Sequence, residues 1–317
     1  MSRILITGAN GFVGKNLSVY LHEKKNILDA LIRNTKTGDA NYKNYINSLF
    51  DYQNIPNFNN YDVIIHTAGK AHDLKNSSTT DEYFKINSEL TQLIFDRFRN
   101  SNCKKFILFS SVKAFADEVY DKLTEEDIPK PSTHYGKSKL LAEEYILSKA
   151  ISEGKRVYIL RPCMIHGPGN KGNLNLLFKL ISKRIPWPLG AFDNKRSLCS
   201  IDNLMFIIKE LIEREDIPSG AYNVADDEAL STNSLISILA ESQNRKPKIW
   251  KVPKGLIQSL ARLGDLIRLP LTTARLKKLT ESYVVSNKKI KVAIGKPLPV
   301  SSKEGLLKTF HSFSSNA

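Results

Sequence analysis

Short apolar segments alternate with longer amphipathic segments along the first half of the chain. Apolar runs lie at residues 3–7, 27–32, 63–67, 105–110 and 156–160, and segments of helical periodicity lie between them at 13–24, 84–99 and 135–150. Strands that alternate with helices of this length predict βαβ units and a parallel sheet. Strands that are apolar throughout are typical of a sheet covered on both faces. We therefore predict an α/β fold built on a doubly wound parallel sheet.

This pattern loosens after residue 161. Proline and glycine recur between Pro162 and Gly190, which indicates a loop-rich stretch. The helices and strands predicted in the second half lie at 174–182, 202–214, 221–225, 254–269 and near 283–285. We predict a first domain over residues 1–161, to which the chain returns at 195–228, and a smaller α/β domain over 162–317.

The composition is that of an ordinary globular protein, with 317 residues of which 41% are hydrophobic and 25% charged. It excludes a disordered, collagen-like or disulfide-scaffold protein. No stretch approaches the ~18 apolar residues of a membrane-spanning helix, and the N-terminus leads into a strand without a signal-peptide pattern. The three cysteines are widely spaced and the six histidines have no metal-ligand spacing. We expect a cytoplasmic protein with free thiols, no integral membrane segment and no metal.

The net charge of +15 is concentrated near the end of the chain. Residues 244–317 contain sixteen Lys/Arg and three Asp/Glu, a net +13, so the first 243 residues carry only +2. Basic surface attracts phosphates, anionic lipids or nucleic acid, but the chain has no nucleic-acid motif and no aromatics interleaved with these charges. A solvated basic face is the alternative.

The predicted helix at 254–269 is amphipathic and basic. Its apolar side favours either core packing or peripheral contact with an anionic membrane surface. The residues on that side are Leu256, Ile257, Leu260, Leu263 and Ile267.

A glycine-rich turn follows the first predicted strand. Gly8, Gly11 and Gly14 stand between the apolar run 3–7 and an amphipathic helix, in the spacing G-x-x-G-x-x-G. Glycines let the backbone approach a pyrophosphate, and the helix N-terminus offers N–H donors and partial positive charge. The place of this turn predicts a Rossmann dinucleotide-binding domain over residues 1–161.

The end of the second strand indicates which dinucleotide binds. An acidic residue there would bind the ribose 2′-hydroxyl of NAD, but this chain has Arg33 at that point, and Asp29 lies too early, inside the strand. Arginine suits a 2′-phosphate, because its guanidinium is always charged and pairs with phosphate oxygens. We expect NADP; the alternative is NAD, with Arg33 stacked on the adenine.

Tyr135 and Lys139 lie four residues apart and share one face of a predicted helix. A phenol with a pKa of about 10 is a poor proton donor or acceptor at pH 7. A neighbouring ammonium, together with the positive nicotinamide, would lower the pKa of Tyr135. Ser111 ends the predicted strand 105–110, and parallel strands end at one edge of a sheet, so Ser111 can meet Tyr135 over the cofactor. The three residues predict proton transfer, with Lys139 also holding the nicotinamide ribose.

These features together resemble the extended short-chain dehydrogenase/reductase family, in its NAD-dependent epimerase/dehydratase group acting on nucleotide sugars. The resemblance spans nearly the whole chain and is also carried by His66-Thr67-Ala68-Gly69, by Asn87, and by Leu160-Arg161-Pro162. The chain most resembles bacterial polysaccharide-cluster proteins that are UDP-glucose 4-epimerase-like, some of which reduce 4-keto sugars. This closer likeness rests on the stretches 109–113, 166–173 and 188–204.

The resemblance implies roles for the matching residues. Those implied to hold the cofactor, in addition to Arg33 and Lys139 argued above, are Gly8, Gly11, Phe12, Val13, Gly14, Asp51, Thr67 and Ala68. Tyr135 would be the catalytic acid/base, with Lys139 as its partner. Those implied to contact the substrate are Ser111 at the sugar oxygen, and Asn173 and Arg196 at the nucleotide diphosphate. A surface ion pair is the alternative for Arg196. Departures from the family pattern at 114–116 and His134 leave the sugar open.

Two reactions fit such a site on a UDP-sugar. We favour reduction of the C4 keto group of a UDP-linked 6-deoxy-N-acetylhexosamine in surface polysaccharide biosynthesis, because Arg33 favours an exchangeable NADPH. The alternative is a UDP-hexose or UDP-N-acetylhexosamine 4-epimerase, which keeps its NAD through the cycle. A non-catalytic NAD(P)-binding regulator is less favoured, because both Tyr135 and Lys139 are present. The resemblance also implies a homodimer.

Overall fold

A parallel sheet of seven strands forms the centre of the computed structural model, which describes residues 1–32, 42, 44–46, 55, 57–70, 79–170, 172–267 and 271–314. In spatial order the strands are β3 (Asn44–Ile46), β2 (Ile27–Leu31), β1 (Arg3–Thr7), β4 (Val63–His66), β5 (Lys105–Phe109), β7 (Arg156–Pro162) and β10 (Gly220–Val224). Every neighbouring pair is parallel. The chain order reverses between β1 and β4, and ligands of doubly wound sheets bind at the carboxyl end of such a switch point.

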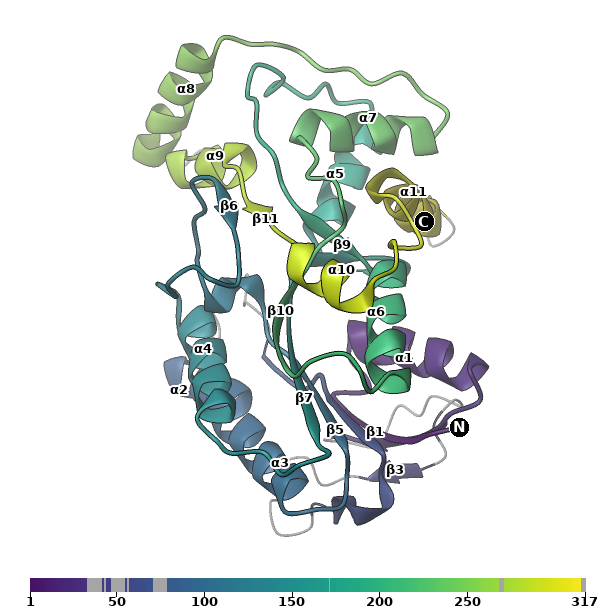
Figure 1. Ribbon diagram of the computed structural model, residues 1–317. Coiled ribbons are helices and arrows are strands. Elements are labelled where there is room, and N and C mark those ends of the chain that lie inside the picture. Colours follow the sequence, from purple (N-terminus) through teal and green to yellow (C-terminus); the bar gives the residue numbers. More distant parts are fainter. Residues whose placement is uncertain are drawn as a thin grey trace.

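Helices cover both faces of this sheet (Figure 1). α1 (Phe12–Glu23) and α6 (Ile201–Glu213) lie on one face, and α3 (Leu90–Arg99) and α4 (His134–Leu147) lie on the other. Side chains alternate along a strand, so Ile4 and Ile6 of β1 pack toward the first pair of helices and Leu5 packs toward the second. The predicted α/β class with a doubly wound parallel sheet is confirmed.

The helix predicted at 84–99 begins earlier and is interrupted. It consists of α2 (Thr80–Phe84), a π-helical turn η2 (Lys85–Glu89) and α3. Thr79 starts it with a capping box: its hydroxyl accepts from the Glu82 N–H at 3.4 Å, and its own N–H donates to Glu82 Oε2 at 3.2 Å. The polar residues before Phe84 therefore belong to the helix. The apolar periodicity did not predict this, because the capping box sets where the helix starts.

The second half adds smaller elements around a third apolar cluster. Its helices are α5 (Asn173–Ser182), α7 (Thr232–Ser242), α8 (Lys254–Ile267), α9 (Thr273–Thr280), α10 (Lys288–Ile294) and α11 (Ser302–Ser314). Short parallel pairs join β6 (Lys122–Leu123) to β11 (Val284–Val285) and β8 (Met164–His166) to β9 (Leu198–Ser200), and single 3₁₀ turns are η1 (Phe58–Asn60) and η3 (Val112–Ala114). Within this half, β10 pairs with β7 in the central sheet and α6 packs on α1.

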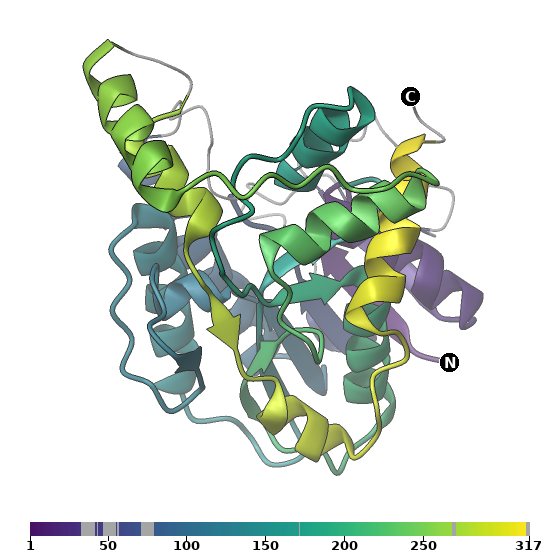
Figure 2. The same cartoon turned by 90° about the horizontal axis from the view of Figure 1, so that it is seen from above.

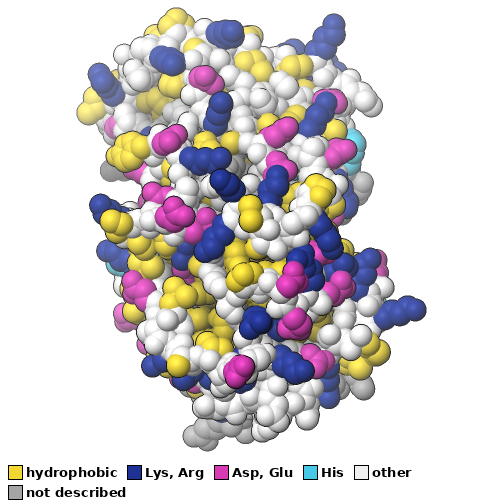
Figure 3. Space-filling view, viewed as in Figure 1, with side chains coloured by type: hydrophobic (Ala, Val, Ile, Leu, Met, Phe, Trp, Pro, Cys, Tyr) yellow, Lys and Arg dark blue, Asp and Glu magenta, His cyan; other side chains and the backbone are white. Residues whose placement is uncertain are grey.

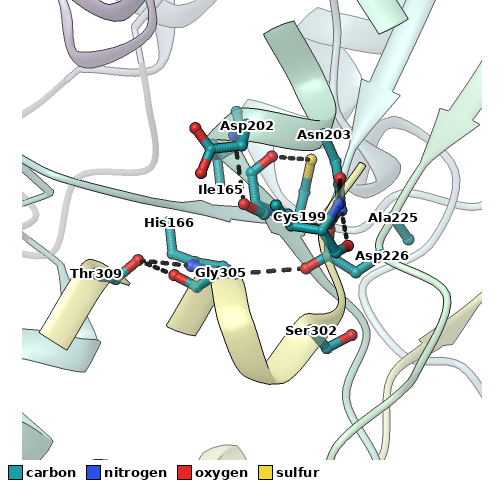
Figure 4. Close-up of polar contacts among 12 residues, drawn as sticks. Ile165, His166, Cys199, Asp202, Asn203, Ala225, Asp226, Ser302, Gly305 and Thr309 are labelled. Atoms are coloured by element: carbon teal, nitrogen blue, oxygen red, sulfur yellow. Dashed lines mark hydrogen bonds and ion pairs between the residues drawn. The ribbon is translucent and has the colours of Figure 1, made fainter. Parts of the chain in front are cut away.

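A buried polar cluster docks the last helix, α11, against the strands β8 and β9 (Figure 4). His166 contacts Thr309 of α11 through Nδ1 at 2.9 Å and Asp226 through Nε2 at 3.4 Å. Asp226 Oδ1 accepts from the Ser200 N–H at 2.9 Å and from Asn203 Nδ2 at 2.7 Å. Buried polar groups are almost always hydrogen-bonded. Because these contacts form only when α11 is in this position, they fix its position against β8 and β9.

Helix α8 projects from the body of the protein (Figures 1 and 2). Its inner side buries Ile257, Ala261 and Gly264. The rest of the predicted apolar side is solvent-exposed, namely Leu256, Leu260, Leu263 and Ile267. The predicted packing of this apolar side into the core is therefore confirmed for only part of it. Among the described residues, no helix is both long and apolar enough to cross a membrane.

Candidate active site

The glycine turn brings the end of β1 against the end of β4. Gly8 has φ +68°, and a Cβ there would lie 2.6 Å from the Ala68 nitrogen and 2.9 Å from the Thr67 carbonyl carbon. A Cβ at Gly14 would lie 2.6 Å from the Ala9 Cα, so α1 packs closely on the turn. Only a residue without Cβ fits at either position.

The first turn of α1 carries no acidic side chain of its own. Gly11 is its N-cap, which provides no side-chain cap, and the first turn, which Phe12 and Val13 begin, has no acidic residue. The first N–H groups of a helix lack intrahelical partners and carry partial positive charge. Together with the close-packed glycines, these features fit a cofactor pyrophosphate, and the N–H groups of this turn would hold it.

The segment after β4 connects this turn to Lys139. Thr67 donates its hydroxyl to the Thr7 carbonyl at 2.6 Å, and the Ala68 N–H donates to the Thr7 hydroxyl at 3.2 Å. A Cβ at Gly69 would lie 2.9 Å from Lys139 Nζ. Thr67 and Ala68 therefore line the same edge of the sheet as the glycine turn, next to the lysine.

Tyr135, Ser111 and Lys139 converge at this edge. Tyr135 stands in the first turn of α4, which Thr133 caps by accepting from the Gly136 N–H at 3.2 Å. The Ser111 side chain, just after β5, lies close enough to the Tyr135 side chain to lower the pKa of its phenol. Lys139, one turn along α4, donates Nζ to the Phe109 carbonyl at 2.9 Å. The structure thus brings the three predicted residues together.

Burial sets the protonation of this group. It raises the pKa of Tyr135, while Ser111 acts in the opposite direction and Tyr83 adds to the rise. The charges of Lys139 and of a bound nicotinamide would act against this rise. Burial also lowers the pKa of Lys139 to about 8, against the charge of Glu143, which raises it. The phenol is therefore protonated at neutral pH and can act as a proton donor.

His66, at the end of β4, forms a hydrogen-bond chain through both of its ring nitrogens. It is fully buried, its Nδ1 contacts the Thr7 hydroxyl at 2.7 Å, and its Nε2 contacts the Thr91 hydroxyl at 3.0 Å. Thr91 donates to the Asn87 carbonyl at 2.8 Å, so it must accept from His66, which places the proton on Nε2. Burial, and to a smaller extent the charge of Lys139, lower the pKa of His66 to about 3. The ring is neutral and satisfied.

Asn87 extends this chain to the catalytic helix. It lies in the π-helical turn η2, a feature often found at functional sites. Its Oδ1 accepts from the Lys70 N–H at 2.7 Å and its Nδ2 donates to the Ser138 hydroxyl at 3.0 Å. Asn87 thereby holds the segment after β4 against α4. The only signal for it in the sequence is its place in the resemblance.

Arg196 lies apart from this group. Its Nη2 donates to the Lys278 carbonyl and its Nε donates to the Glu281 carbonyl at 3.2 Å, at the end of α9. Nη2 also lies 3.4 Å from the Glu281 carboxylate, and burial lowers the pKa of the guanidinium. Arg33 and Asp51 lie outside the described residues, as does the side chain of Asn173.

Asp29 is engaged away from the glycine turn. Its Oδ2 accepts from Arg3 at 2.7 Å and from the Tyr61 hydroxyl at 3.0 Å. In the described part of the chain, no group of three or more His, Cys, Asp and Glu side chains is arranged to hold a metal ion.

Comparison with known proteins gives a family in agreement with this site. The model of the NAD dependent epimerase/dehydratase family matches residues 4–225. The chain belongs to this family. The match contains the glycine turn and the Ser111, Tyr135 and Lys139 positions, and the predicted family is confirmed.

Three relatives within the epimerase/dehydratase family have named activities. A UDP-glucose 4-epimerase from Vibrio cholerae is 31% identical over 324 residues, which cover 98% of this chain and 95% of the relative. An N-acetyl-α-D-glucosaminyl-diphospho-ditrans,octacis-undecaprenol 4-epimerase from Escherichia coli O157:H7 is 27% identical over 80% of this chain and 76% of its own. A UDP-2-acetamido-2,6-β-L-arabino-hexul-4-ose reductase from Pseudomonas aeruginosa is 26% identical over 81% and 63%, respectively.

The fold is also that of solved structures. The Bordetella bronchiseptica enzyme WbmG in complex with NAD and UDP superposes with a TM-score of 0.77 at 16% identity, over 99% of this chain and 96% of WbmG. The likeness extends over both halves of the chain.

Proposed function

We propose that this protein is an NADP(H)-dependent enzyme that reduces the C4 keto group of a UDP-linked 6-deoxy-N-acetylhexosamine. The observation that carries the proposal is the convergence of Tyr135, Ser111 and Lys139 beside the glycine turn. When bound, the cofactor supplies hydride to the sugar carbon. The chain supplies the proton and holds the sugar oxygen.

Each of the three residues then has one task. Tyr135 donates its phenolic proton to the sugar oxygen, and burial suits this task because it keeps the phenol protonated at neutral pH. Ser111, which lies next to Tyr135 and accepts from the Lys113 N–H at 3.2 Å, would donate its hydroxyl proton to the same oxygen. The Lys139 ammonium stabilises the phenolate that remains after proton donation, and it would also hold the nicotinamide ribose beside Gly69.

A 4-epimerase is the second candidate function. It needs Tyr135 first as a base and then as an acid, and the Vibrio cholerae relative carries that name. We favour reduction because the phenol is held protonated, and because Asp29 is bound by Arg3 and Tyr61 and so is not free to bind a ribose 2′-hydroxyl. Arg33 would then pair with a 2′-phosphate, and Asp51 would contact the adenine.

The UDP group would bind to the second half of the chain, which we propose as the substrate domain (162–317). A cavity of about 350 Å³ opens between α8, α9 and Phe192. Arg262 and Lys277 line it, and Lys277 lies on the helix whose end holds Arg196. A cationic cavity beside an aromatic ring suits a nucleoside diphosphate. Asn173 and Arg196 would contact the phosphates.

We further propose peripheral contact with an anionic membrane through the outer side of α8, and a homodimer by analogy with the resemblance. Lys and Arg side chains lie among apolar ones at the α8 end of the molecule (Figure 3). Residues 244–267 carry six Lys/Arg against one Asp, so an anionic surface complements them. The name of the Escherichia coli relative refers to a sugar linked to undecaprenol, and undecaprenol is a lipid.

Vesicle sedimentation tests the membrane contact. The protein should sediment with phosphatidylglycerol vesicles at low salt and stay in solution with phosphatidylcholine alone. Replacing Leu260 and Leu263 by Gln should abolish binding. Val292→Gln, which changes an even more exposed apolar residue on α10, should not. Binding that survives the double replacement, or that is absent from the start, refutes this contact.

A panel of UDP-sugars and UDP-4-keto sugars tests the reaction. Net oxidation of NADPH with a 4-keto sugar supports the reductase, and inversion at C4 without net cofactor change supports the epimerase. If no sugar is turned over although the cofactor binds, a non-catalytic regulator is the better interpretation. The dinucleotide that co-purifies, and whether dilution removes it, distinguishes an exchangeable NADP(H) from a retained NAD.

A further inference from the structure

A buried ion pair lies behind the proposed catalytic residues and has no part in the reaction as described so far. The side chains of Glu143 and Arg161 are 1% and 3% exposed. Glu143 Oε2 accepts from Arg161 Nε at 2.9 Å and from Nη2 at 2.6 Å, and Oε1 accepts from the Ser110 hydroxyl. An apolar pair of similar volume would often stabilise a fold as well or better, so stability alone does not account for these charges.

The pair joins the elements that carry the proposed site. Glu143 lies on α4, one turn after Lys139. Ser110 directly precedes Ser111 at the end of β5, and its N–H donates to the Leu160 carbonyl at 2.8 Å. The carboxylate therefore ties the helix of the lysine to the strand end of the serine.

The aromatic residue Phe115 closes the other side of the pair. The Arg161 guanidinium lies over its ring, 3.7 Å from the centroid, and Arg161 is near the end of β7. Phe115 follows η3, the turn that Ser111 caps. The ion pair is thus enclosed by β5, β7, α4 and this turn. The guanidinium is held through Nε, Nη2 and its flat face, whereas Nη1 is buried without a hydrogen-bond partner.

The charge of Glu143 also acts on Lys139. Burial lowers the pKa of Lys139, and Glu143 opposes that effect. In the described part of the chain, the other titratable groups in this region include Tyr135 on α4, which is protonated, and Tyr83, which packs against the ring of Tyr135. His66 at the end of β4 is neutral. Arg161 is positive, but its charge is directed at Glu143.

We propose that Glu143 is a positioning residue: it fixes Ser110, and with it Ser111, against α4, and its negative charge keeps the Lys139 ammonium charged at neutral pH. This inference rests on the proposed function of the same site. A purely structural ion pair would change stability when broken, but it would leave the pH dependence of the site where it is.

Three variants separate the two effects. Ser110→Ala removes the hydrogen bond and leaves the charge. Glu143→Gln removes the charge and keeps an oxygen that can accept from Ser110. Glu144→Gln makes the same chemical change at the exposed neighbouring residue. The readouts are kcat and KM of the holoenzyme with the sugar from the panel, and NADPH affinity between pH 6 and 9 by fluorescence quenching. The affinity measurement does not depend on turnover.

Ser110→Ala should lower kcat about 10- to 100-fold, since a small misplacement of a reacting group has such effects, and should leave the pH dependence unchanged. In Glu143→Gln the Lys139 ammonium loses its proton at lower pH. The loss of activity and NADPH affinity on raising the pH should therefore begin about 1 pH unit lower than in wild type. Glu144→Gln should match wild type in both readouts.

An unshifted pH dependence of NADPH affinity in folded Glu143→Gln overturns the proposal. If Glu143→Gln does not fold, Ser110→Ala tests the proposal instead. A kcat of Ser110→Ala equal to that of wild type overturns the positioning role. A wild-type protein that binds NADPH but turns over no sugar contradicts the proposed function, whereas the affinity shift still tests Glu143.

Discussion

Acid should destabilise this protein through one buried imidazole, that of His66. The ring is fully buried and uses Nδ1 to accept from Thr7 and Nε2–H to donate to Thr91. A proton added to Nδ1 would leave it facing a donor and would bring an unpaired charge into the interior. The perturbation to compare with wild type is His66→Gln, which keeps a donor and an acceptor but cannot be protonated.

The magnitude follows from the two pKa values of His66. The folded state holds it at about 3, against 6.5 for an ordinary histidine. As the pH falls below 6.5, the unfolded chain binds a proton that the folded protein does not, so stability falls. Each pH unit is worth about 1.4 kcal/mol. Between pH 6.5 and 4.5, wild type should lose about 3 kcal/mol of unfolding free energy through this residue.

Urea denaturation of both proteins at several pH values gives the assay. His66→Gln should be the less stable protein at pH 7, because amide packing is imperfect, but the gap should narrow by about 3 kcal/mol by pH 4.5. His22→Gln on the exposed surface of α1 should follow wild type throughout. A constant gap between wild type and His66→Gln, or an NMR titration of His66 near pH 6.5, would refute the reasoning.

Three further predictions concern single positions. Tyr135→Phe should lower kcat at least about 100-fold and leave NADPH affinity within about threefold, because only the proton donor is lost; turnover and fluorescence titration check this, and unchanged turnover contradicts the assigned role. Gly14→Ala should weaken NADPH binding and cost about 1–3 kcal/mol by urea denaturation, because its Cβ meets backbone at 2.6 Å; Gly255→Ala, with no atom within 4 Å, should not destabilise. Gly305→Ala should also cost about 1–3 kcal/mol, because its Cβ would lie 2.7 Å from the Ser200 hydroxyl and unseat α11; an unchanged midpoint would show that the cluster gives way freely.

Elements with a strong local pattern were predictable. β1, β4 and β5 are short, are apolar apart from residues at their ends, and each ends within one residue of its predicted end. α1 follows its 3.6-residue periodicity. The start of α2 was missed, because it is set by the capping box of Thr79 and Glu82 and not by apolar spacing. The sequence also did not predict that one side of α8 is buried and the other is exposed. An apolar stripe on a helix does not indicate which of its residues other elements will cover.

The candidate site also contains features that were predictable from the sequence and features that were not. The spacing of Tyr135 and Lys139 and the position of Ser111 predict a meeting point, and the structure brings them together. The direction of the pKa change of Tyr135 was not predictable, because burial depends on the surrounding elements. Glu143 stands in the sequence as an ordinary helical acid, and its partner Arg161 is 18 residues away.

The sequence by itself determined the order of strands and helices, the glycine turn and the tyrosine–lysine face, because each is a pattern within a few neighbouring residues. The tertiary structure alone decided which polar groups share a buried environment. Thr7 meets His66 across 59 residues, and His166 meets Thr309 across 143. Such contacts form only when strands and helices pack, and burial then makes hydrogen bonds and charges strong enough to set protonation.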